Sequence, residues 1–387
     1  MIEERAYWLA WAKISGLGPI ALQKLKEEFK TLARAWTATS TELGHISGFG
    51  HQTIKKIVEE RSRMNPEELL KEHIEKNPNF WTPADPDYPR LLQEIPTPPP
   101  LLYYRGIVNP QEIQGITPTV GIVGTRNPSE YGRRWTRKIT RILAKSGFTI
   151  VSGLAAGIDT EAHSTCIQIG GRTIAVFGNG VDMVYPRENK SLAEQVVKHG
   201  LAVSEYPAGT KPNSRHFPQR NRIIAGLSRA VLIMEAPQKS GALITANIAN
   251  EFGRDVYVLP ARLDDQKSHG CLQLISKGAE VIPITMDRLL EMLGAMPPLE
   301  IDVGESLEKS SLVEEKNQTL IPDLEPMLAE ILQHISTEPM VLDLIIQKTG
   351  LSSGEVSSSL LQLELLGLVT QLPGCLLYTS PSPRDRG

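Results

Sequence analysis

The fold is decided by residues 119–126, which read Thr-Val-Gly-Ile-Val-Gly-Thr-Arg: a short apolar, β-branched run that ends in a glycine turn and an arginine. Five similar runs follow, mostly with helical patterns between them, at Phe148–Val151, Thr173–Phe177, Leu201–Ser204, Ala230–Glu235 and Asp255–Leu259. Strands that alternate with helices and are apolar along nearly their whole length are typical of a parallel sheet covered on both faces. The sequence therefore predicts an α/β domain with a mainly parallel sheet over residues 118–294.

The segments before this domain have a different pattern. Residues 1–76 show short amphipathic helices broken by glycines, which predicts a small all-helical domain. Two Gly-x-Gly turns, in residues 14–19 and 46–51, each precede a helical pattern and resemble the helix-hairpin-helix repeat. Such turns either bring backbone N–H groups to a phosphate or are merely tight interhelical turns, and the sequence leaves both open. Residues 77–117 are rich in proline and predict a connector with a lead-in strand near residues 101–104.

The segments after the α/β domain predict a linker over residues 295–325 and a winged-helix-like domain over residues 326–375. Three short helical patterns, Met327–Ile335, Val341–Thr349 and Ser353–Leu366, precede the start of a hairpin. Residues 351–375 contain Glu355 and Glu364 but neither lysine nor arginine, which disfavours contact with duplex DNA and favours a protein-contact or structural module. Residues 376–387 turn abruptly to low complexity, which we interpret as a non-native tail.

Composition narrows the class of protein. The chain has 387 residues and a formal net charge of -3, so nucleic-acid binding would need a local basic patch. The three cysteines, Cys166, Cys271 and Cys375, are far apart and have no zinc-ligand spacing, which predicts reduced thiols and no metal site. No apolar stretch is long enough to span a membrane and the N-terminus is acidic, so we expect a cytoplasmic protein.

Glycine-rich turns follow the first three strands of the predicted sheet. They include Gly124, Thr125 and Arg126 after the first strand, residues 152–157 after the second and residues 178–182 after the third. Because ligands of open parallel sheets bind beyond the carboxyl ends of the strands, these turns predict an anion site. None makes a full Gly-x-Gly-x-x-Gly with an acidic residue after the next strand, so no dinucleotide cofactor is expected.

Residues 215–229 form a basic segment with four arginines, one histidine and no acid. Arg220 and Arg222 could hold phosphate oxygens, and Phe217 could stack on a base. A solvated basic turn is the alternative, but three glycine turns at one edge favour the anion site. The basic stripe on residues 134–145 is better explained as a solvated helix face.

Two groupings suggest an enzyme instead. Asp159 and His163 are four residues apart on a predicted helix, as an acid/base pair could be, although such pairs more often stabilise structure. Residues 239–246 with Glu251 resemble a turn of nucleotide hydrolases of the lysine-decarboxylase-like type, without their fuller Pro-Gly-Gly-x-Gly-Thr sequence. A nucleotide or nucleoside hydrolase is therefore the alternative function, ranked below binding.

Five motifs together resemble the DNA-processing protein A family, DprA, also called Smf. In order and spacing they are residues 124–126, residues 152–159 with His163, residues 178–182 with Tyr185 and Pro186, residues 217–226, and residues 240–246. The resemblance implies a SAM-like or helix-hairpin-helix domain, an extended Rossmann-like domain and a winged helix. It implies single-stranded DNA binding without sequence preference, protection of incoming DNA in natural transformation, and loading of the recombinase RecA.

The resemblance also implies a homodimer through the Rossmann-like domain, with no catalytic activity and no cofactor. Carried over by motif, the DNA site includes Arg126, Ser152, Gly153, Arg220, Asn221 and Arg222, with Phe217 nearby. Gly124 and Thr125 belong to the same predicted site as part of the first glycine turn.

Overall fold

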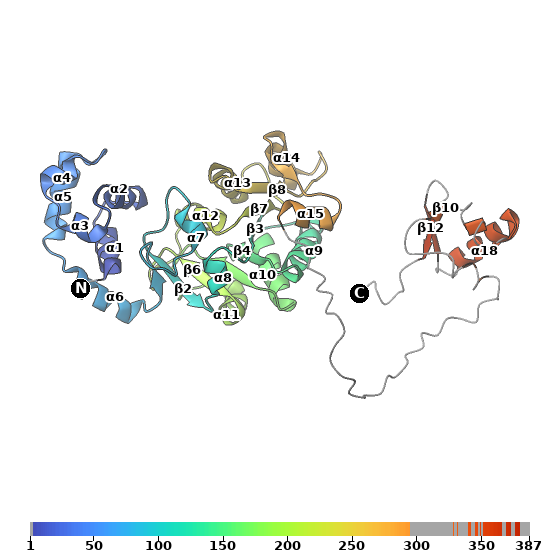
Figure 1. Cartoon of the computed structure of the whole chain (residues 1–387), viewed down its shortest axis with the longest axis horizontal. Coiled ribbons are helices and arrows are strands. Elements are labelled where there is room, and N and C mark those ends of the chain that lie inside the picture. Colours follow the sequence, from blue (N-terminus) through green and yellow to red (C-terminus); the bar gives the residue numbers. More distant parts are fainter. Residues whose placement is uncertain are drawn as a thin grey trace, which may run out of the picture. The chain divides into compact units, whose positions relative to one another are not determined.

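The computed structural model describes residues 3–294 continuously and, beyond them, residues 328, 331, 340–341, 345–346, 349, 351–365, 369–372 and 376–379. The chain divides into two compact units, residues 1–300 and 301–387, of which the first holds the helical and α/β parts (Figure 1).

A nine-stranded sheet forms the centre of the first unit. Its order is β1-β2-β6-β5-β4-β3-β7-β8-β9, with β3 to β9 mutually parallel and β2 antiparallel to β6. The strands are β1 (Phe80–Trp81), β2 (Leu102–Gly106), β3 (Thr119–Val123), β4 (Thr149–Ser152), β5 (Thr173–Val176), β6 (Leu201–Ser204), β7 (Ala230–Ile233), β8 (Asp255–Val258) and β9 (Glu280–Val281). The six predicted strands are confirmed as β3 to β8, and the predicted α/β class is confirmed with them.

Helices cover both faces of the sheet because successive strand residues point to opposite sides. In β3, Val120 and Ile122 belong to the core under one face, whereas Val123 belongs to the core under the other. The first face is covered by α9 (Glu130–Lys145), α10 (Ile158–Gln168), α11 (Lys190–His199) and α15 (Met286–Met292). The second is covered by α7 (Arg90–Gln93), α12 (His216–Gly226), α13 (Gly241–Glu251) and α14 (His269–Ser276).

The strand order places a topological switch point at β3. From β3 the chain builds β4, β5 and β6 on one side, then returns to β7 on the other side. The connections that leave β3 and β7 therefore diverge and open a crevice at the carboxyl end of β3. The quoted stretch 119–126 runs along this strand and into the crevice.

The N-terminal helices form a small domain with its own core around Trp11, Leu22 and Leu25 (Figure 1). They are α1 (Glu4–Lys13), α2 (Pro19–Phe29), α3 (Leu32–Trp36), α4 (Ser40–Gly44), α5 (His51–Arg61) and α6 (Pro66–Lys76). Ala6 and Leu9 of α1 pack with residues of β1 and β2, so this domain adjoins the edge of the sheet.

The structure separates the two interpretations of the Gly-x-Gly turns. In the first turn, the amide of Ser15 donates to the Glu60 carboxylate at 2.8 Å, so a protein carboxylate already occupies the place of an anion. In the second turn, the carbonyl of Ser47 accepts from Lys24 Nζ at 2.7 Å. The first turn is thus an interhelical turn, whereas the second brings a lysine to the domain surface.

The α/β unit begins earlier than predicted. The segment 77–117, predicted as a connector with one lead-in strand, supplies β1, β2 and the short helices α7 and α8 (Pro110–Ile113). The stacked rings of Trp81 and Tyr104, with centroids 3.8 Å apart, join β1 to β2. The many prolines of the segment obscure both strands, of which β1 lies at the edge of the sheet and β2 pairs with β1 and with β6.

The described parts of the second unit agree with a winged helix. They are β10 (Met340–Val341), α18 (Ser353–Leu365), β11 (Val369–Leu372) and β12 (Leu376–Thr379), with strand order β10-β12-β11. Two predictions are corrected: Val341 lies in a strand and not at the start of a helix, and residues 376–379 form a strand paired with β11 and not part of a tail. Most of the first two predicted helices, the linker, Cys375 and the rest of the tail lie outside the described residues.

Candidate functional site

A cavity of about 550 Å³ opens at the carboxyl end of β3, at the switch point of the sheet. We call it the rim site. Its walls come from the turn after β3, the loop before α12, the first turns of α12, and the turn that leads into α13. Lining residues used below are Gly124, Thr125, Arg126, Asp159, Tyr185, Phe217, Arg220, Asn221, Lys239, Ser240 and Gly241.

The turn after β3 presents an arginine that is free to bind a ligand. The amide of Thr125 donates to the carbonyl of Glu235 at 2.7 Å, which ties this turn to the end of β7. Gly157, at φ +85°, packs so closely under the backbone of Arg126 that a Cβ there would lie 2.6 Å from the Arg126 carbonyl carbon. The Arg126 side chain is exposed, and within residues 3–294 it forms no ion pair. The fixed backbone therefore aims an uncompensated cation over the cavity.

Arg220, unlike Arg126, is buried, and its hydrogen bonds hold the turn after β4 in place. Its guanidinium donates to the carbonyl of Gly153 at 2.6 Å and to the carbonyl of Val176. The amide of the same Gly153 donates to the Asp159 carboxylate at 3.0 Å, and the amide of Ala155 donates to it at 3.3 Å. A side chain on Gly153 would collide with the guanidinium, so glycine is required for this approach.

The electrostatics of this clamp show opposing effects. Burial raises the pKa of Asp159, while the Arg220 charge and the two backbone N–H groups lower it. Burial likewise lowers the pKa of Arg220 to about 10, against the opposing effect of Asp159. Arg220 is therefore a cation at neutral pH. Arg220 and Asp159 both line the rim site, so the charge of Arg220 is opposed there by that of Asp159.

Aromatic rings form one wall of the rim site. Phe217, in the first turn of α12, stacks on Tyr185 with ring centroids 5.3 Å apart and an interplanar angle of 27°. The Arg126 guanidinium carbon lies 5.8 Å from the Phe217 ring centroid. Tyr185 is 44% exposed, so it can offer a ring face to a planar ligand. An exposed cation and an exposed ring face thus lie side by side.

The turn before α13 closes the cavity on the other side. Ser240 caps this helix by accepting from the amide of Ala242, and Asn221 Nδ2 donates to the carbonyl of Gly241 at 3.3 Å. Lys239 is exposed next to this helix start and forms no ion pair within the continuous described part. The positive end of the helix and the lysine add to the attraction for an anion.

The structure brings together six of the nine predicted site residues. Gly124, Thr125, Arg126, Phe217, Arg220 and Asn221 line the rim site. Ser152 and Gly153 lie beneath it: Ser152 is fully buried, and its hydroxyl donates to the carbonyl of Ile122 at 2.6 Å. Arg222 faces away, where it pairs with Glu205 and donates to the carbonyl of Thr97 at 2.7 Å.

Five of the lining residues named above were not among the predicted DNA-site residues: Asp159, Tyr185, Lys239, Ser240 and Gly241. Tyr185 and Lys239 lie in motifs that follow strands at the edge where the site is expected. Position after a strand was thus a usable signal for both. The third glycine turn does not line the cavity. Its Gly178 carbonyl lies 3.2 Å from His216 Nδ1, so this turn supports the start of α12.

Asp159 and His163 do not form a catalytic pair. His163 is fully buried, and its Nδ1 lies 2.7 Å from the hydroxyl of Thr173, a residue of β5 inside the domain. Burial, helped by the Arg220 charge, lowers the pKa of His163 to about 3. A neutral imidazole without access to the cavity cannot exchange protons with a bound ligand, which supports the structural interpretation of this pair.

Burial of His163 predicts a specific acid sensitivity. The unfolded chain binds a proton at this residue below about pH 6.5, whereas the folded chain does not until about pH 3, so acidification favours unfolding. The contribution of neutral His163 to the free energy of unfolding is fully present above about pH 6.5. Below that pH the free energy of unfolding falls by about 1.4 kcal/mol per pH unit. Chemical denaturation of wild type and His163→Gln between pH 7 and 4 should show a steeper loss in wild type. Parallel curves for the two proteins would contradict this account. Burial also lowers the pKa of His73, to about 4, but His73 is present in both proteins and contributes equally to both curves.

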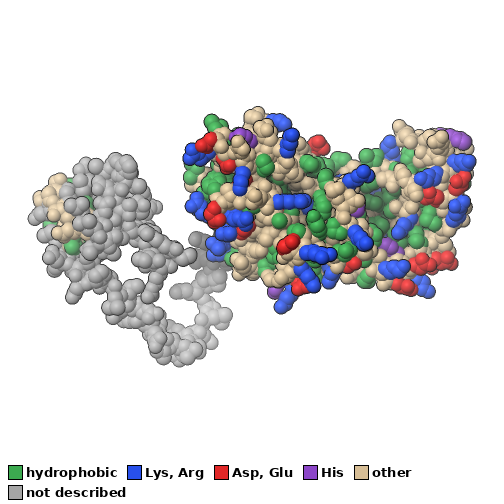
Figure 2. Space-filling model, turned by 180° about the vertical axis from the view of Figure 1, so that it is seen from behind, with side chains coloured by type: hydrophobic (Ala, Val, Ile, Leu, Met, Phe, Trp, Pro, Cys, Tyr) green, Lys and Arg blue, Asp and Glu red, His purple; other side chains and the backbone are tan. Residues whose placement is uncertain are grey.

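Two further features bear on the class of protein. Within the described residues, none of the helices is both long and apolar enough to cross a membrane, and no three His, Cys, Asp or Glu side chains gather into a metal-binding group. On the face shown in Figure 2, lysine and arginine side chains alternate with acidic ones over the described part. Attraction for an anionic ligand is therefore local to particular sites.

The fold and the rim site together define an α/β protein with a cavity at the topological switch point, where exposed cations lie beside stacked aromatic rings. Comparison with known proteins agrees with this class. Residues 79–294 match the family model of DNA recombination-mediator protein A, and residues 315–375 match that of the DprA winged helix domain. The chain belongs to the DprA/Smf family of DNA recombination mediators.

Individual relatives extend over most of the chain. Protein Smf of Synechocystis is 54% identical over 96% of this chain and 98% of its own length. A crystal structure of DprA from Streptococcus pneumoniae is 37% identical, with a TM-score of 0.65 over 75% of this chain and 99% of that one. A structure of DNA processing protein A from Helicobacter pylori, which concerns that protein's single-stranded DNA binding mode, is 31% identical with a TM-score of 0.50, over 55% of this chain and 95% of that one.

Proposed function

We propose that this protein binds single-stranded DNA at the rim site, without sequence preference, and passes the strand to a recombinase. One observation carries the proposal: Arg126, which is exposed and has no ion pair within residues 3–294, stands beside the stacked rings of Phe217 and Tyr185 in a cavity at the switch point of the sheet. Arginine holds phosphate oxygens, and ring faces accept any base. The site thus matches a polymer of phosphates and bases whose sequence is not read.

Duplex DNA does not match this site as well. Its bases are stacked on one another and cannot lie against Tyr185, so a duplex could use only the phosphate contacts. We expect preference for single strands from this difference. The single-stranded DNA binding mode described for the Helicobacter pylori relative supports the proposal.

A binding assay on the full chain tests the proposal. Fluorescence anisotropy would compare a labelled oligothymidylate, a mixed-sequence strand of equal length, the corresponding duplex and mononucleotide competitors, all at one salt concentration. We expect similar affinity for the two single strands, weaker binding of the duplex and poor competition by mononucleotides. Tight mononucleotide binding with steady hydrolysis would instead support the nucleotide or nucleoside hydrolase.

We expect no turnover by this protein. The Asp159 carboxylate accepts two backbone N–H groups, and His163 has no access to the cavity. The rim site therefore offers a ligand cations and ring faces, but no acid/base pair. Protection of a bound strand follows from occupancy of its phosphates and bases, and it requires no chemistry.

The proposed function includes a recombinase partner and a homodimeric assembly. We propose RecA as the recombinase, natural transformation in the cytoplasm as the setting, and a homodimer through the Rossmann-like domain as the assembly. Leu263 and Ile284 support the dimer: they are 84% and 98% exposed, and they follow the adjacent strands β8 and β9 at one edge of the sheet. Light scattering of wild type and of Leu263→Asp/Ile284→Asp would test it, with a monomeric double variant as the expected result.

The C-terminal domain is predicted to be dispensable for binding a single strand. Residues 351–375 supply no lysine or arginine and add two glutamates, so close approach to DNA phosphates is unfavourable. A chain that ends at Gly294 should keep most of the full-length affinity at matched salt, with any deficit in assembly or partner contact. A hundredfold weaker affinity of the shortened chain, with folding and assembly intact, would show that this domain contacts DNA.

A further inference from the structure

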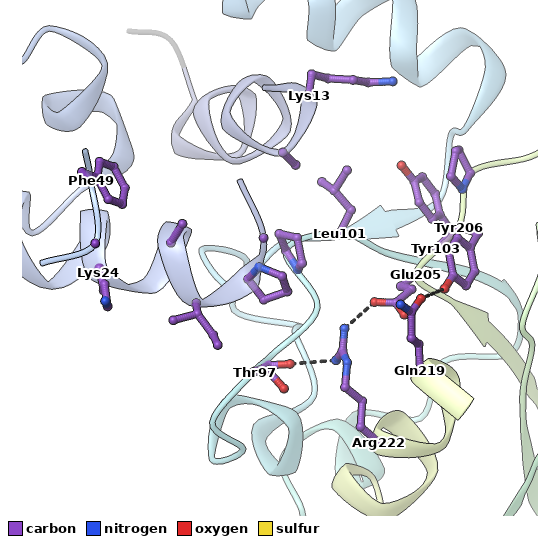
Figure 3. Close-up of a pocket in the computed structure, with 18 of the residues that line it drawn as sticks. Lys13, Lys24, Phe49, Thr97, Leu101, Tyr103, Glu205, Tyr206, Gln219 and Arg222 are labelled. Carbon is purple, nitrogen blue, oxygen red and sulfur yellow. Dashed lines mark hydrogen bonds and ion pairs between the residues drawn. The ribbon is translucent and has the colours of Figure 1, made fainter. Parts of the chain in front are cut away.

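A second cavity, of about 750 Å³, lies between the helical domain and the α/β domain. We call it the interdomain cleft. Its walls come from α1, α2 and the second Gly-x-Gly turn on one side, and from β2, the loop after β6 and α12 on the other (Figure 3). Both walls belong to the same compact unit. The cleft is therefore a feature separate from the rim site, and the proposed function does not use it.

The lining of the cleft carries a local positive charge in a chain that is acidic overall. It includes three cations, Lys13, Lys24 and Arg222, and one carboxylate, Glu205, which leaves a formal charge of +2. Arg222 is paired with Glu205, so within residues 3–294 the charges without an ion-pair partner in the cleft are those of the two lysines. Lys13 is exposed and has no ion pair within residues 3–294, and Lys24 donates only to the carbonyl of Ser47. An anionic ligand would satisfy both ammonium groups.

Helix α12 connects the cleft to the rim site. Phe217 and Arg220 face the rim site, whereas Gln219 and Arg222 of the same helix face the cleft, because residues two apart point to nearly opposite sides of a helix. The two cavities therefore share α12 as a wall.

An aromatic pair stands where this wall begins. The ring of His216, the first residue of α12, stacks on Tyr206 with centroids 4.0 Å apart and planes at 15°. Tyr206 lines the cleft, and its hydroxyl donates to Gln219 at 3.0 Å, as Figure 3 shows. Two exposed cations, Lys211 and Arg215, precede the helix, and neither has an ion pair in the continuous described part. Cations and a ring face, the groups that define the rim site, thus continue to the mouth of the cleft.

We infer that the DNA strand bound at the rim site continues over the first turn of α12 into the interdomain cleft, where Lys13 and Lys24 hold its phosphates. This inference rests on the proposed function and extends it, because it assigns the helical domain a role in DNA binding. The second Gly-x-Gly turn contributes through the lysine that it orients. The first turn, occupied by Glu60, does not contribute.

The test is affinity as a function of strand length, measured on full chains at one salt concentration. Oligothymidylates would be compared from the shortest that binds wild type up to lengths at which affinity stops rising. Lys13→Glu should bind the shortest strands as wild type does and bind the long strands about tenfold more weakly, with a shallower salt dependence. Lys71→Glu is the matched control: it makes the same charge change in the same domain, at an exposed residue outside both cavities.

A second measurement uses the wild-type protein alone. Acetylation of lysines, read by mass spectrometry, should show Lys13 and Lys24 protected by a long strand but not by the shortest one, with Lys71 modified equally throughout. Equal length profiles for Lys13→Glu and Lys71→Glu, or no protection by the long strand, would overturn the inference. So would a Lys13→Glu variant that loses only recombinase delivery, because the cleft would then be a protein-binding surface. Failure of wild type to bind any strand would overturn the proposed function as well.

Discussion

Arg126→Ala is expected to weaken single-stranded DNA binding by about 10- to 150-fold. This range corresponds to about 1.5–3 kcal/mol for the loss of one hydrogen-bonded contact to a charged group. Arg126 is exposed, lacks an ion pair in the continuous described part, and is held over the rim site by a turn whose backbone is fixed. Its loss should weaken all sequences equally and reduce the slope of log affinity against log salt by about 0.7, the value for one phosphate of a single strand.

Arg141→Ala is the matched control for this variant. Arg141 is also an exposed arginine without an ion pair in the continuous described part, but it lies on α9 outside the rim site. The two variants have the same net charge, so a general electrostatic effect would weaken both. Equal affinities for Arg126→Ala and Arg141→Ala at every salt concentration would remove Arg126 from the site.

Asp159→Ala is expected to lower the free energy of unfolding by about 2–4 kcal/mol, because two backbone N–H groups lose their acceptor at about 1–3 kcal/mol each. The substitution leaves the amides of Gly153 and Ala155 without their acceptor and leaves buried Arg220 without its nearest opposite charge. Urea denaturation at neutral pH measures the change. Arg220→Ala should have a similar effect. Any loss of DNA binding in that variant must therefore be measured without denaturant, at a temperature at which the variant is folded.

Asp264→Ala serves as the control for Asp159→Ala. Asp264 pairs with Arg262 at 2.9 Å, but both side chains are more than 70% exposed, and solvent-exposed pairs contribute little to stability. A stability loss in Asp159→Ala no larger than that of the control would show that the clamp does not hold the turn after β4. Loss of a nucleotide hydrolysis activity in Asp159→Ala would show that the residue is catalytic.

The sheet could be predicted closely because its signal is strong and local. Runs such as Thr119–Val123 are buried on both faces, so nearly every residue must be apolar, and no surface requirement blurs the pattern. The two antiparallel strands β1 and β2 lack that signal. β1 has two residues, and β2 follows a cluster of prolines, so only the pairing of Tyr103 with Phe80 and with Ser204 identifies them as part of the sheet.

The site could be predicted only in part, and α12 shows why. The basic run 215–229 was treated as one anion-binding patch, but as a helix it distributes its arginines in different directions. Arg220 points to the sheet, and Arg222 points to Glu205 and the cleft. Arg229 lies past the helix and donates to the carbonyl of Gly115. The composition of a run predicts the chemistry that it can supply, whereas the helical period decides which residues supply it at one place.

Crosslinking of a short photoreactive oligothymidylate to the full wild-type chain, with mass spectrometry of the labelled peptides, tests the central claim most directly. The strand should be just long enough to bind, so that only its primary site is labelled. We expect labels in the three segments that line the rim site, residues 124–126, 212–221 and 237–245, with Tyr185 as a further target. Labels confined to the C-terminal domain, or to the amino-terminal ends of β3 and β7 around Gly115 and Arg229, would contradict the account.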